Sequence, residues 1–458
     1  MGATAVDAGR LTAPAYALHL LDDLGAAPLR APACGDEHPA LGWARSGLMV
    51  LTGTADGAPQ HCPAPLTTCA DGALAALASL APPGAFDDLR GSQLLAERAA
   101  IAGYSRRGTI SPGGACHLLD TIDGAIALNL ARDDDWSLLP AWLETDVAAE
   151  WASVSAAVRG RTMHDCVERG RVLGLAVAPV APPLSKQLPW PWLQNSLYPP
   201  AERGEREFNA KPRVLDLSSL WAGPLCSHLL QRCGADVVKL ESTQRPDGAR
   251  HGPPAFFDLL NTGKRSVALD FATAEGRARL RALIDRADIV IEASRPRALR
   301  QLGIDAEQVL REQPQLTWIS LTGYGRAEPQ AQWIAYGDDA GVAAGLSYLM
   351  RVTTGSTVFV GDAIADPLAG LHAALAGWAS WQAGGGALIS IALVDVVRHC
   401  LGFEAPTHLD GWRQRAADWR AVAAEEPVRA PVARTPSGSA PALGADTAAV
   451  FADWGIAC

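Results

Sequence analysis

Two aspartates precede a proline and an alanine-rich run in the segment 361–376, which reads G-D-A-I-A-D-P-L-A-G-L-H-A-A-L-A. Asp366 stands directly before the proline, where an aspartate is a favoured helix cap that contributes about 1 kcal/mol. A carboxylate at a helix start also faces backbone N–H groups, which keep it ionised and can stabilise a developing oxyanion. An ionised carboxylate can attack an activated acyl group and form a mixed anhydride. The local sequence leaves both interpretations open, a helix cap and a nucleophile.

Two turns of the second half carry residues that could bind phosphate. The turn S-L-W-A-G-P-L contains Ala222 and Gly223, and small residues there would let a phosphate approach the start of the next helix. The turn N-T-G-K-R contains Asn261, Lys264 and Arg265, which either clamp phosphates or form an exposed basic turn. The dinucleotide pattern G-x-G-x-x-G is missing from the first turn, which argues against an NAD(P)-dependent oxidoreductase.

Composition and charge exclude several classes of protein. Hydrophobic residues make up 48% and charged residues 19% of the 458 residues, which predicts two or three folded domains. The formal net charge is -10 and the basic residues are scattered, which argues against a nucleic-acid partner. The nine cysteines form no C-x-x-C pair, which favours reduced thiols and no metal site. Neither a signal peptide nor a membrane span is recognisable, so we expect a cytoplasmic protein.

The second half alternates between strands and helices. Short apolar runs predict strands at 213–217, 234–241, 266–270, 287–292 and 317–322, with helices at 223–232, 273–286 and 305–311 between them. Such alternation predicts an α/β fold, in which a doubly wound parallel sheet has helices on both faces.

The remaining segments predict smaller units around this sheet domain. A small α+β domain is expected at 111–182, with a hairpin arm at 123–130 and helices at 136–143 and 147–160. The proline-rich segment 183–211 predicts a linker into the sheet domain, which we place at 212–400. We expect 401–458 to be an extended segment that ends in a helix at 446–454 and packs back on the molecule.

Residues 1–110 are alanine-rich and carry a faint repeat of the second half. When Gly72 is aligned with Gly370, the A-A-L-A three residues further on is aligned with a second A-A-L-A, without a gap. In this register Thr68 stands opposite Asp366, so the first copy has no carboxylate at that place.

Five blocks, taken in order over about 213–397, carry a resemblance to a known family. They are V-L-D-L-S-S-L-W-A-G-P-L, L-N-T-G-K-R-S-V, A-D-I-V-I-E-A-S-R-P-R, S-L-T-G-Y-G and A-D-P-L-A-G-L-H. Together they resemble the class III CoA-transferase family, which also contains formyl-CoA transferase, carnitine CoA-transferase and α-methylacyl-CoA racemase. In this resemblance Asp366 occupies the place of the catalytic aspartate.

The resemblance implies a CoA-transferase that uses acyl-CoA and a carboxylic acid as substrates and holds no tightly bound cofactor. Asp366 would attack the donor thioester, and the released CoA would convert the anhydride into an aspartyl-CoA thioester. An incoming acid would then leave as the new acyl-CoA. The positions matched to CoA-binding residues are Ala222, Gly223, Asn261, Lys264, Arg265, Arg300 and Tyr324.

Three departures from the family qualify these expectations. Ala293 and Ser294 replace the common N-F pair on the adenine side, which favours a non-catalytic CoA-binding partner or scaffold as the alternative function. Tyr336 and Gly337 stand near the place of the racemase histidine, so racemisation is not expected. The small-domain block precedes the sheet, as in a fused tandem of two copies, one without its sheet and the other without its small domain. This order weakens the expectation of a homodimer.

Overall fold

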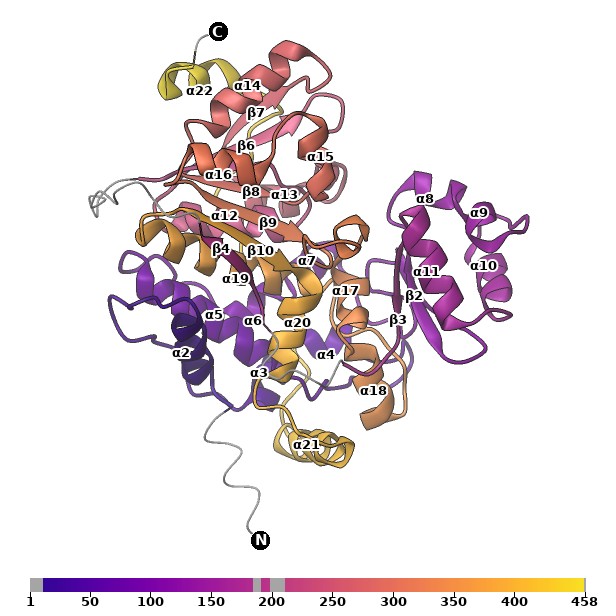
Figure 1. Ribbon diagram of the computed structural model, residues 1–458. Coiled ribbons are helices and arrows are strands. Elements are labelled where there is room, and N and C mark those ends of the chain that lie inside the picture. Colours follow the sequence, from indigo (N-terminus) through magenta and orange to yellow (C-terminus); the bar gives the residue numbers. More distant parts are fainter. Residues whose placement is uncertain (1–10, 184–190, 198–210, 457–458) are drawn as a thin grey trace.

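The computed structural model describes residues 11–183, 191–197 and 211–456. Its largest element is a seven-stranded sheet with the order β4-β10-β9-β8-β5-β6-β7 (Figure 1). The strands from β5 to β10 run parallel to one another, in the order typical of a Rossmann-type sheet. The predicted doubly wound α/β fold is therefore confirmed. The strands are β4 Gln194–Leu197, β5 Arg213–Asp216, β6 Asp236–Ser242, β7 Arg265–Leu269, β8 Ile289–Glu292, β9 Thr317–Thr322 and β10 Ala387–Ala392.

Neighbouring residues of each strand contribute to two different cores. Val214 and Ile289 pack with α12, α19 and α20, whereas Leu215 and Val290 pack with α14 and α16 on the other face. This alternation follows from the pleat of the strand, which points successive side chains to opposite faces. The helices of this unit are α12 Ala222–Arg232, α13 Pro254–Asn261, α14 Ala274–Ile284, α15 Pro296–Gln301, α16 Ala306–Glu312, α17 Gly337–Ala343, α18 Leu346–Thr354, α19 Ala365–Gln382 and α20 Leu393–Gly402.

The small α+β unit lies to one side of the molecule and has its own core (Figure 1). Its antiparallel sheet has the order β1-β2-β3, and one face packs on α9, α10 and α11. The other face packs on Val342 and Phe359 of the sheet unit. The helix predicted at 136–143 is two helices, and Pro140 lies in the first turn of the second one, where proline is tolerated. The elements are β1 Cys116–Asp120, β2 Ala125–Asn129, β3 Ala176–Pro179, α8 Asp133–Ser137, α9 Leu139–Leu143, α10 Trp151–Val158 and α11 Met163–Leu173.

The N-terminal helices share a core with the sheet unit, in which Tyr16 and Leu77 are buried together with Leu371. They include α3, α4 and α5, which have the same order and register as α17, α18 and α19 in the sequence repeat. Gly47 and Gly345, both left-handed, precede the second helix of each set. The helices are α2 Ala13–Asp23, α3 Pro39–Arg45, α4 Leu48–Leu51, α5 Leu66–Leu80, α6 Gly91–Leu94 and α7 Glu97–Ala102.

Part of the segment predicted as a linker, 183–211, joins the sheet. Trp192 is buried, and β4 adds an antiparallel edge strand to β10. The four residues of β4 are all exposed and lack the apolar alternation that predicts a strand. Only the backbone pairing with β10 defines this strand. The rest of the predicted linker, at 184–190 and 198–210, lies outside the described residues.

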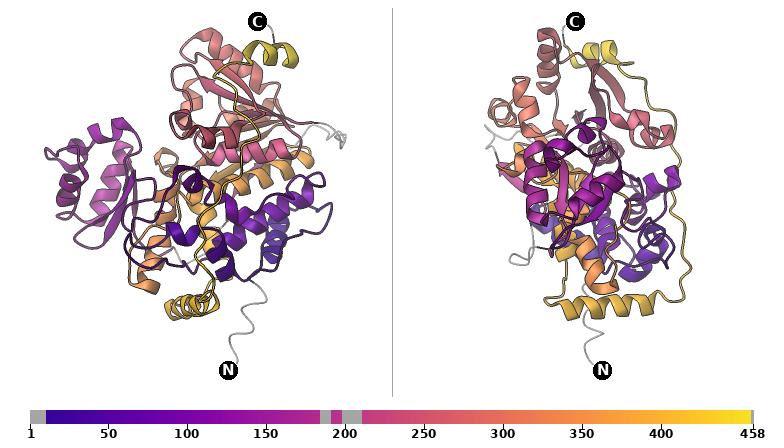
Figure 2. Two further views of the ribbon diagram at one scale, coloured as in Figure 1. Left: turned by 180° about the vertical axis from the view of Figure 1, so that it is seen from behind. Right: turned by 90° about the vertical axis from the view of Figure 1, so that its right-hand side faces the viewer.

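The chain after α20 forms α21 (Leu409–Val422), then runs extended along the molecule to α22 (Thr447–Trp454) (Figure 2). There the Asp446 carboxylate accepts a hydrogen bond of 2.8 Å from the backbone of Ser266 in β7. Of the helices that the structure describes, none has the length and apolar character needed to cross a membrane.

Gly72 tests the contact between α2 and α5. A Cβ atom at this position would lie 2.6 Å from the carbonyl oxygen of Ala13 and 3.0 Å from Cβ of Tyr16. We expect Gly72→Ala to lower the free energy of unfolding by about 1–3 kcal/mol, since the overpacked helices must separate. Urea unfolding measures the loss. Gly160→Ala, which has no atom closer than 3.9 Å, is the control, and equal stability of the two variants would contradict this packing.

Candidate active site

Asp366 lies in the first turn of α19, where Ile364 is the N-cap residue, so its interpretation as a helix cap is wrong. Its side chain is partly exposed, whereas Ala365 and Pro367 on either side are buried. The backbone N–H of Gly337 donates a hydrogen bond to its carboxylate. A side chain on Gly337 would collide with that carboxylate, so glycine is needed for this contact. The carboxylate of Asp366, at the start of a buried helix, is thus held in place and is still accessible.

The loop before α19 is strained. Ala363 has a φ of 43°, which is unfavourable for a residue with a side chain. Its N–H donates to Asp338 Oδ1 at 2.8 Å, and its carbonyl accepts from the N–H of Asp366 at 2.9 Å. The carboxylate of Asp338 therefore stabilises the turn that orients Asp366.

Arg98 lies in α7, which is far from Asp362 in the sequence. It forms a bidentate ion pair with Asp362. Its Nε and one terminal nitrogen donate to the two carboxylate oxygens at 2.8 and 2.6 Å. Asp362 is completely buried, and the guanidinium lies over the ring of Trp221 at 5.4 Å. Gly113 approaches from the loop before β1, with its Cβ position 3.9 Å from Asp362. The N-terminal segment therefore completes the surroundings of Asp366.

The three carboxylates of this site compete for one positive charge. Burial raises the pKa of Asp366 to about 7, and Arg98 opposes this rise while Asp338 and Asp362 add to it. Burial and Asp362 likewise raise the pKa of Asp338 to about 6. Near neutral pH, Asp366 therefore exchanges between its protonated form and its ionised form.

The predicted phosphate ligand Lys264 is buried in a polar network beneath the turn that leads into α12. Its ammonium donates to Asn261 Oδ1 at 2.9 Å and to Ser227 Oγ at 2.7 Å, and pairs with Asp216 at 3.3 Å. Burial lowers its pKa to about 8, against the opposing effect of Asp216. Contact of Lys264 or Asn261 with a phosphate would require these bonds to break.

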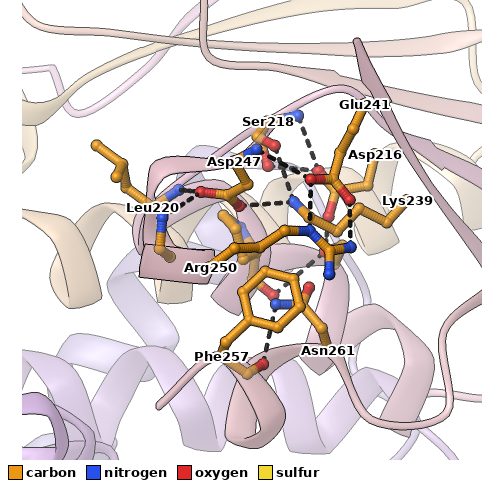
Figure 3. Close-up of polar contacts among 12 residues, drawn as sticks. Asp216, Ser218, Leu220, Lys239, Glu241, Asp247, Arg250, Phe257 and Asn261 are labelled. Carbon is orange, nitrogen blue, oxygen red and sulfur yellow. Dashed lines mark hydrogen bonds and ion pairs between the residues drawn. The ribbon is translucent and has the colours of Figure 1, made fainter. Parts of the chain in front are cut away.

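The same network fixes the turn of Ser218 and Leu220 (Figure 3). Lys239 pairs with Asp247 at 2.9 Å and donates to the carbonyl of Ser218 at 3.0 Å. Asp247 in turn accepts a hydrogen bond of 2.9 Å from the N–H of Leu220. The buried charges thus hold a loop at the carboxyl edge of the sheet in one conformation.

Ala222 and Gly223 are both buried at the start of α12. Glycine is required at position 223 because a side chain would collide with Ser218. Gly223 therefore packs against its own chain, which leaves no support for the idea that its small size admits a ligand.

The other predicted CoA contacts are spread around the sheet. Arg265 opens β7 at the amino edge, opposite the edge where α19 begins, and pairs with Asp236 and Asp453. Arg300 is exposed and pairs with Asp305 at 2.9 Å. Tyr324 follows β9 and packs edge-on against Trp333 with ring centroids 5.3 Å apart. The structure does not bring Arg265 together with Asp366.

Lys264→Met tests whether Lys264 supports the fold. Removal of the ammonium leaves Asp216 and Asn261 buried without this partner, so we expect the free energy of unfolding to fall by about 3–5 kcal/mol. Urea unfolding checks this loss against Lys211→Met, which removes an exposed lysine. A variant of normal stability with weakened CoA binding would instead show that Lys264 contacts the ligand.

Arg98→Met tests the charge balance around Asp366. Loss of the guanidinium disfavours the carboxylate, so we expect the pKa of Asp366 to rise above its value of about 7 and its neutral form to persist at higher pH. Carbon-13 NMR titration of the aspartate carboxyl groups measures the pKa of Asp366. The signal of Asp366 is assigned as the one that is missing from the spectrum of Asp366→Asn. Arg98→Lys keeps the charge and should shift the pKa less. An unchanged pKa in Arg98→Met would exclude this role.

Taken together, the fold and site define a doubly wound α/β protein with an accessible carboxylate at the carboxyl edge of its sheet. Residues 210–433 match the family model described as CoA-transferase family III. Succinate–glutarate CoA-transferase of Agrobacterium fabrum is 33% identical over 213 residues, which cover 41% of this chain and 52% of that protein. Formyl-CoA:oxalate CoA-transferase of Escherichia coli is 31% identical over 167 residues, which cover 35% of this chain and 40% of that protein.

Solved structures match over a similar part of the chain. A hypothetical protein from Mycobacterium tuberculosis is 29% identical with a TM-score of 0.38, over 40% of this chain and 55% of that one. A CAIB/BAIF family protein from Brucella suis is 30% identical with a TM-score of 0.37, over 48% and 58%. The chain spans about half the length of the curated relatives it matches. Residues 210–433 are therefore similar to CoA-transferase family III.

Several residues of the site were not predicted from the sequence. Asp362 was visible as the first of two aspartates, yet nothing marked it as the partner of Arg98. Asp338 lies in a G-D-D run that reads as an ordinary helix start. The only available signal was the presence of other aspartates near Asp366 and in the G-D-D run, and that signal is weak without the fold.

Proposed function

We propose that the protein is a CoA-transferase in which Asp366 carries the acyl and CoA groups in turn. The observation that carries this proposal is the position of Asp366, an accessible carboxylate with a raised pKa at the start of α19, within the part of the chain that matches the family. Arg98 would favour its ionised form and the N–H of Gly337 would orient it.

The reaction proceeds in balanced steps. An oxygen of Asp366 attacks the carbonyl carbon of the donor acyl-CoA, the C–S bond breaks, and CoA leaves as a thiolate. The thiolate attacks the Asp366 carbonyl of the anhydride and releases the donor acid, which carries one oxygen from Asp366. The acceptor carboxylate then attacks the aspartyl-CoA thioester and displaces the thiolate. The thiolate finally attacks the acceptor carbonyl, which gives the new acyl-CoA and regenerates Asp366.

A CoA-binding partner without turnover is the second candidate. It is favoured by Ala293 and Ser294, small residues after β8 where the family often has an N-F pair. In that case the protein would bind CoA, and Asp366 would not be modified. A cytoplasmic location and a homodimer also stay predictions.

Trapping of the covalent intermediate tests the function. We expect acyl-CoA donors to give a CoA adduct on the peptide that contains Asp366, and hydroxylamine to convert it into a hydroxamate. The panel includes succinyl-CoA and formyl-CoA, the donors that names of the relatives suggest. Mass spectrometry of the digested protein reads the adduct.

Two variants control this experiment. Asp366→Asn should abolish the adduct, whereas Asp410→Asn, which removes an exposed aspartate of α21, should leave it unchanged. CoA binding without an adduct from any donor would overturn the transferase proposal and support the binding protein.

A further inference from the structure

The extended chain between α21 and α22, residues 423–446, crosses the N-terminal helices on its way to the sheet (Figure 2). We call it the C-terminal strap. A Cβ atom on Gly47 would lie only 2.4 Å from Cα of Pro431, so the strap lies directly against the chain that leads into α4. Further on, the backbone N–H of Ala440 donates to Asp258 in α13 at 2.8 Å. The strap is therefore anchored on both sides of Arg434.

Arg434 connects two helices that are far apart in the sequence. Its Nε and one terminal nitrogen donate to the two carboxylate oxygens of Glu97, the first residue of α7, at 2.6 and 2.9 Å. Its other terminal nitrogen donates to Nε2 of His228 in α12 at 2.8 Å. Burial and the charge of Arg434 lower the pKa of His228 well below its usual value, so this ring is neutral and can accept the bond. One guanidinium thus bridges α7 and α12.

Glu97 depends on this contact because its carboxylate is buried. Its side chain is only 2% exposed, and a carboxylate removed from water is stable only when a counter-ion and hydrogen bonds replace the solvent. The guanidinium of Arg434 supplies both, and the backbone N–H of Arg434 adds a third donor at 3.3 Å. The strap therefore stabilises the start of α7.

The next residue of α7 is Arg98, which faces the site of Asp366. Arg98 pairs with Asp362 and also lies over the ring of Trp221, the N-cap residue of α12. Two consecutive residues thus fix α7 to α12, Glu97 through Arg434 and Arg98 through Trp221. Since α7 has only six residues, a shift of its first residue would also move the second.

We propose that Arg434 is a positioning residue, which fixes α7 so that Arg98 remains paired with Asp362 beside Asp366. The strap then completes the surroundings of Asp366 from a residue just beyond the part of the chain that matches the family model, which ends at 433. The consequence for turnover rests on the proposed function, because it supposes that the ionised form of Asp366 reacts.

Carbon-13 NMR titration of the full chain, without any CoA compound, tests this role. In Arg434→Met, Glu97 loses its counter-ion and Arg98 its fixed position, so we expect the pKa of Asp366 to rise by about one pH unit as the nearby positive charge withdraws. Arg434→Lys keeps the charge but not the planar fork that bridges Glu97 and His228, and should give a smaller rise. The control Arg429→Met removes an exposed arginine of the same strap and should leave the pKa unchanged.

The double variant Arg98→Met/Arg434→Met separates positioning from a direct effect of charge. If Arg434 acts through Arg98, the pKa of Asp366 in the double variant equals that in Arg98→Met. A further rise in the double variant, or an unchanged pKa in Arg434→Met, would overturn the inference. Arg434→Lys, alone and combined with Arg98→Met, gives the same comparison if Arg434→Met does not fold.

Trapping of the adduct on Asp366 distinguishes this inference from the proposed function. At neutral pH, the initial rate of adduct formation should fall about fivefold in Arg434→Met, because a smaller fraction of Asp366 is ionised, and should recover at higher pH. Absence of any adduct in the wild type would overturn the transferase proposal, while the NMR comparison would still decide the role of Arg434.

Discussion

Close packing of α19 against α12 is the constraint on which the site depends. Gly370 of α19 faces the carbonyl oxygen of Ala222, where an added Cβ would lie only 2.7 Å away. Along α19, alanines and glycines are buried on all sides, with the sheet on one face and α5 on another. A helix enclosed in this way cannot shift without opening the core. Its first turn, and with it Asp366, is therefore fixed relative to the carboxyl edge of the sheet.

Three separate parts of the chain meet at that first turn. Arg98 comes from the N-terminal helices, the loop of Gly113 leads into the small unit, and Asp338 belongs to α17. The small unit is further tied to α17 by a hydrogen bond of 3.0 Å from Asn129 to Asp339. Their combined effect is electrostatic, because one guanidinium is set against three carboxylates in a buried environment. This balance places the pKa of Asp366 near neutral pH.

Local patterns predicted the sheet well and the site in part. The strands from β5 to β9 are short apolar runs, and their alternation with helices was enough to predict a doubly wound parallel sheet. Strand β4 was missed because its residues are exposed and its only stabilising partner is the backbone of β10. Asp366 was found through its resemblance to a family, whereas its partner charges come together only in the folded chain, Arg98 and Asp362 lying 264 positions apart. For Lys264, the sequence could not reveal that its side chain points inward.

The most direct test of the account is the fate of the oxygen atoms of Asp366. One turnover with an acceptor acid whose carboxylate oxygens carry a heavy isotope should leave one labelled oxygen in the peptide that contains Asp366, because the acceptor oxygen stays on the aspartate when the anhydride is cleaved. Mass spectrometry of that peptide reads the label. CoA transfer that leaves the peptide unlabelled would contradict covalent catalysis by Asp366.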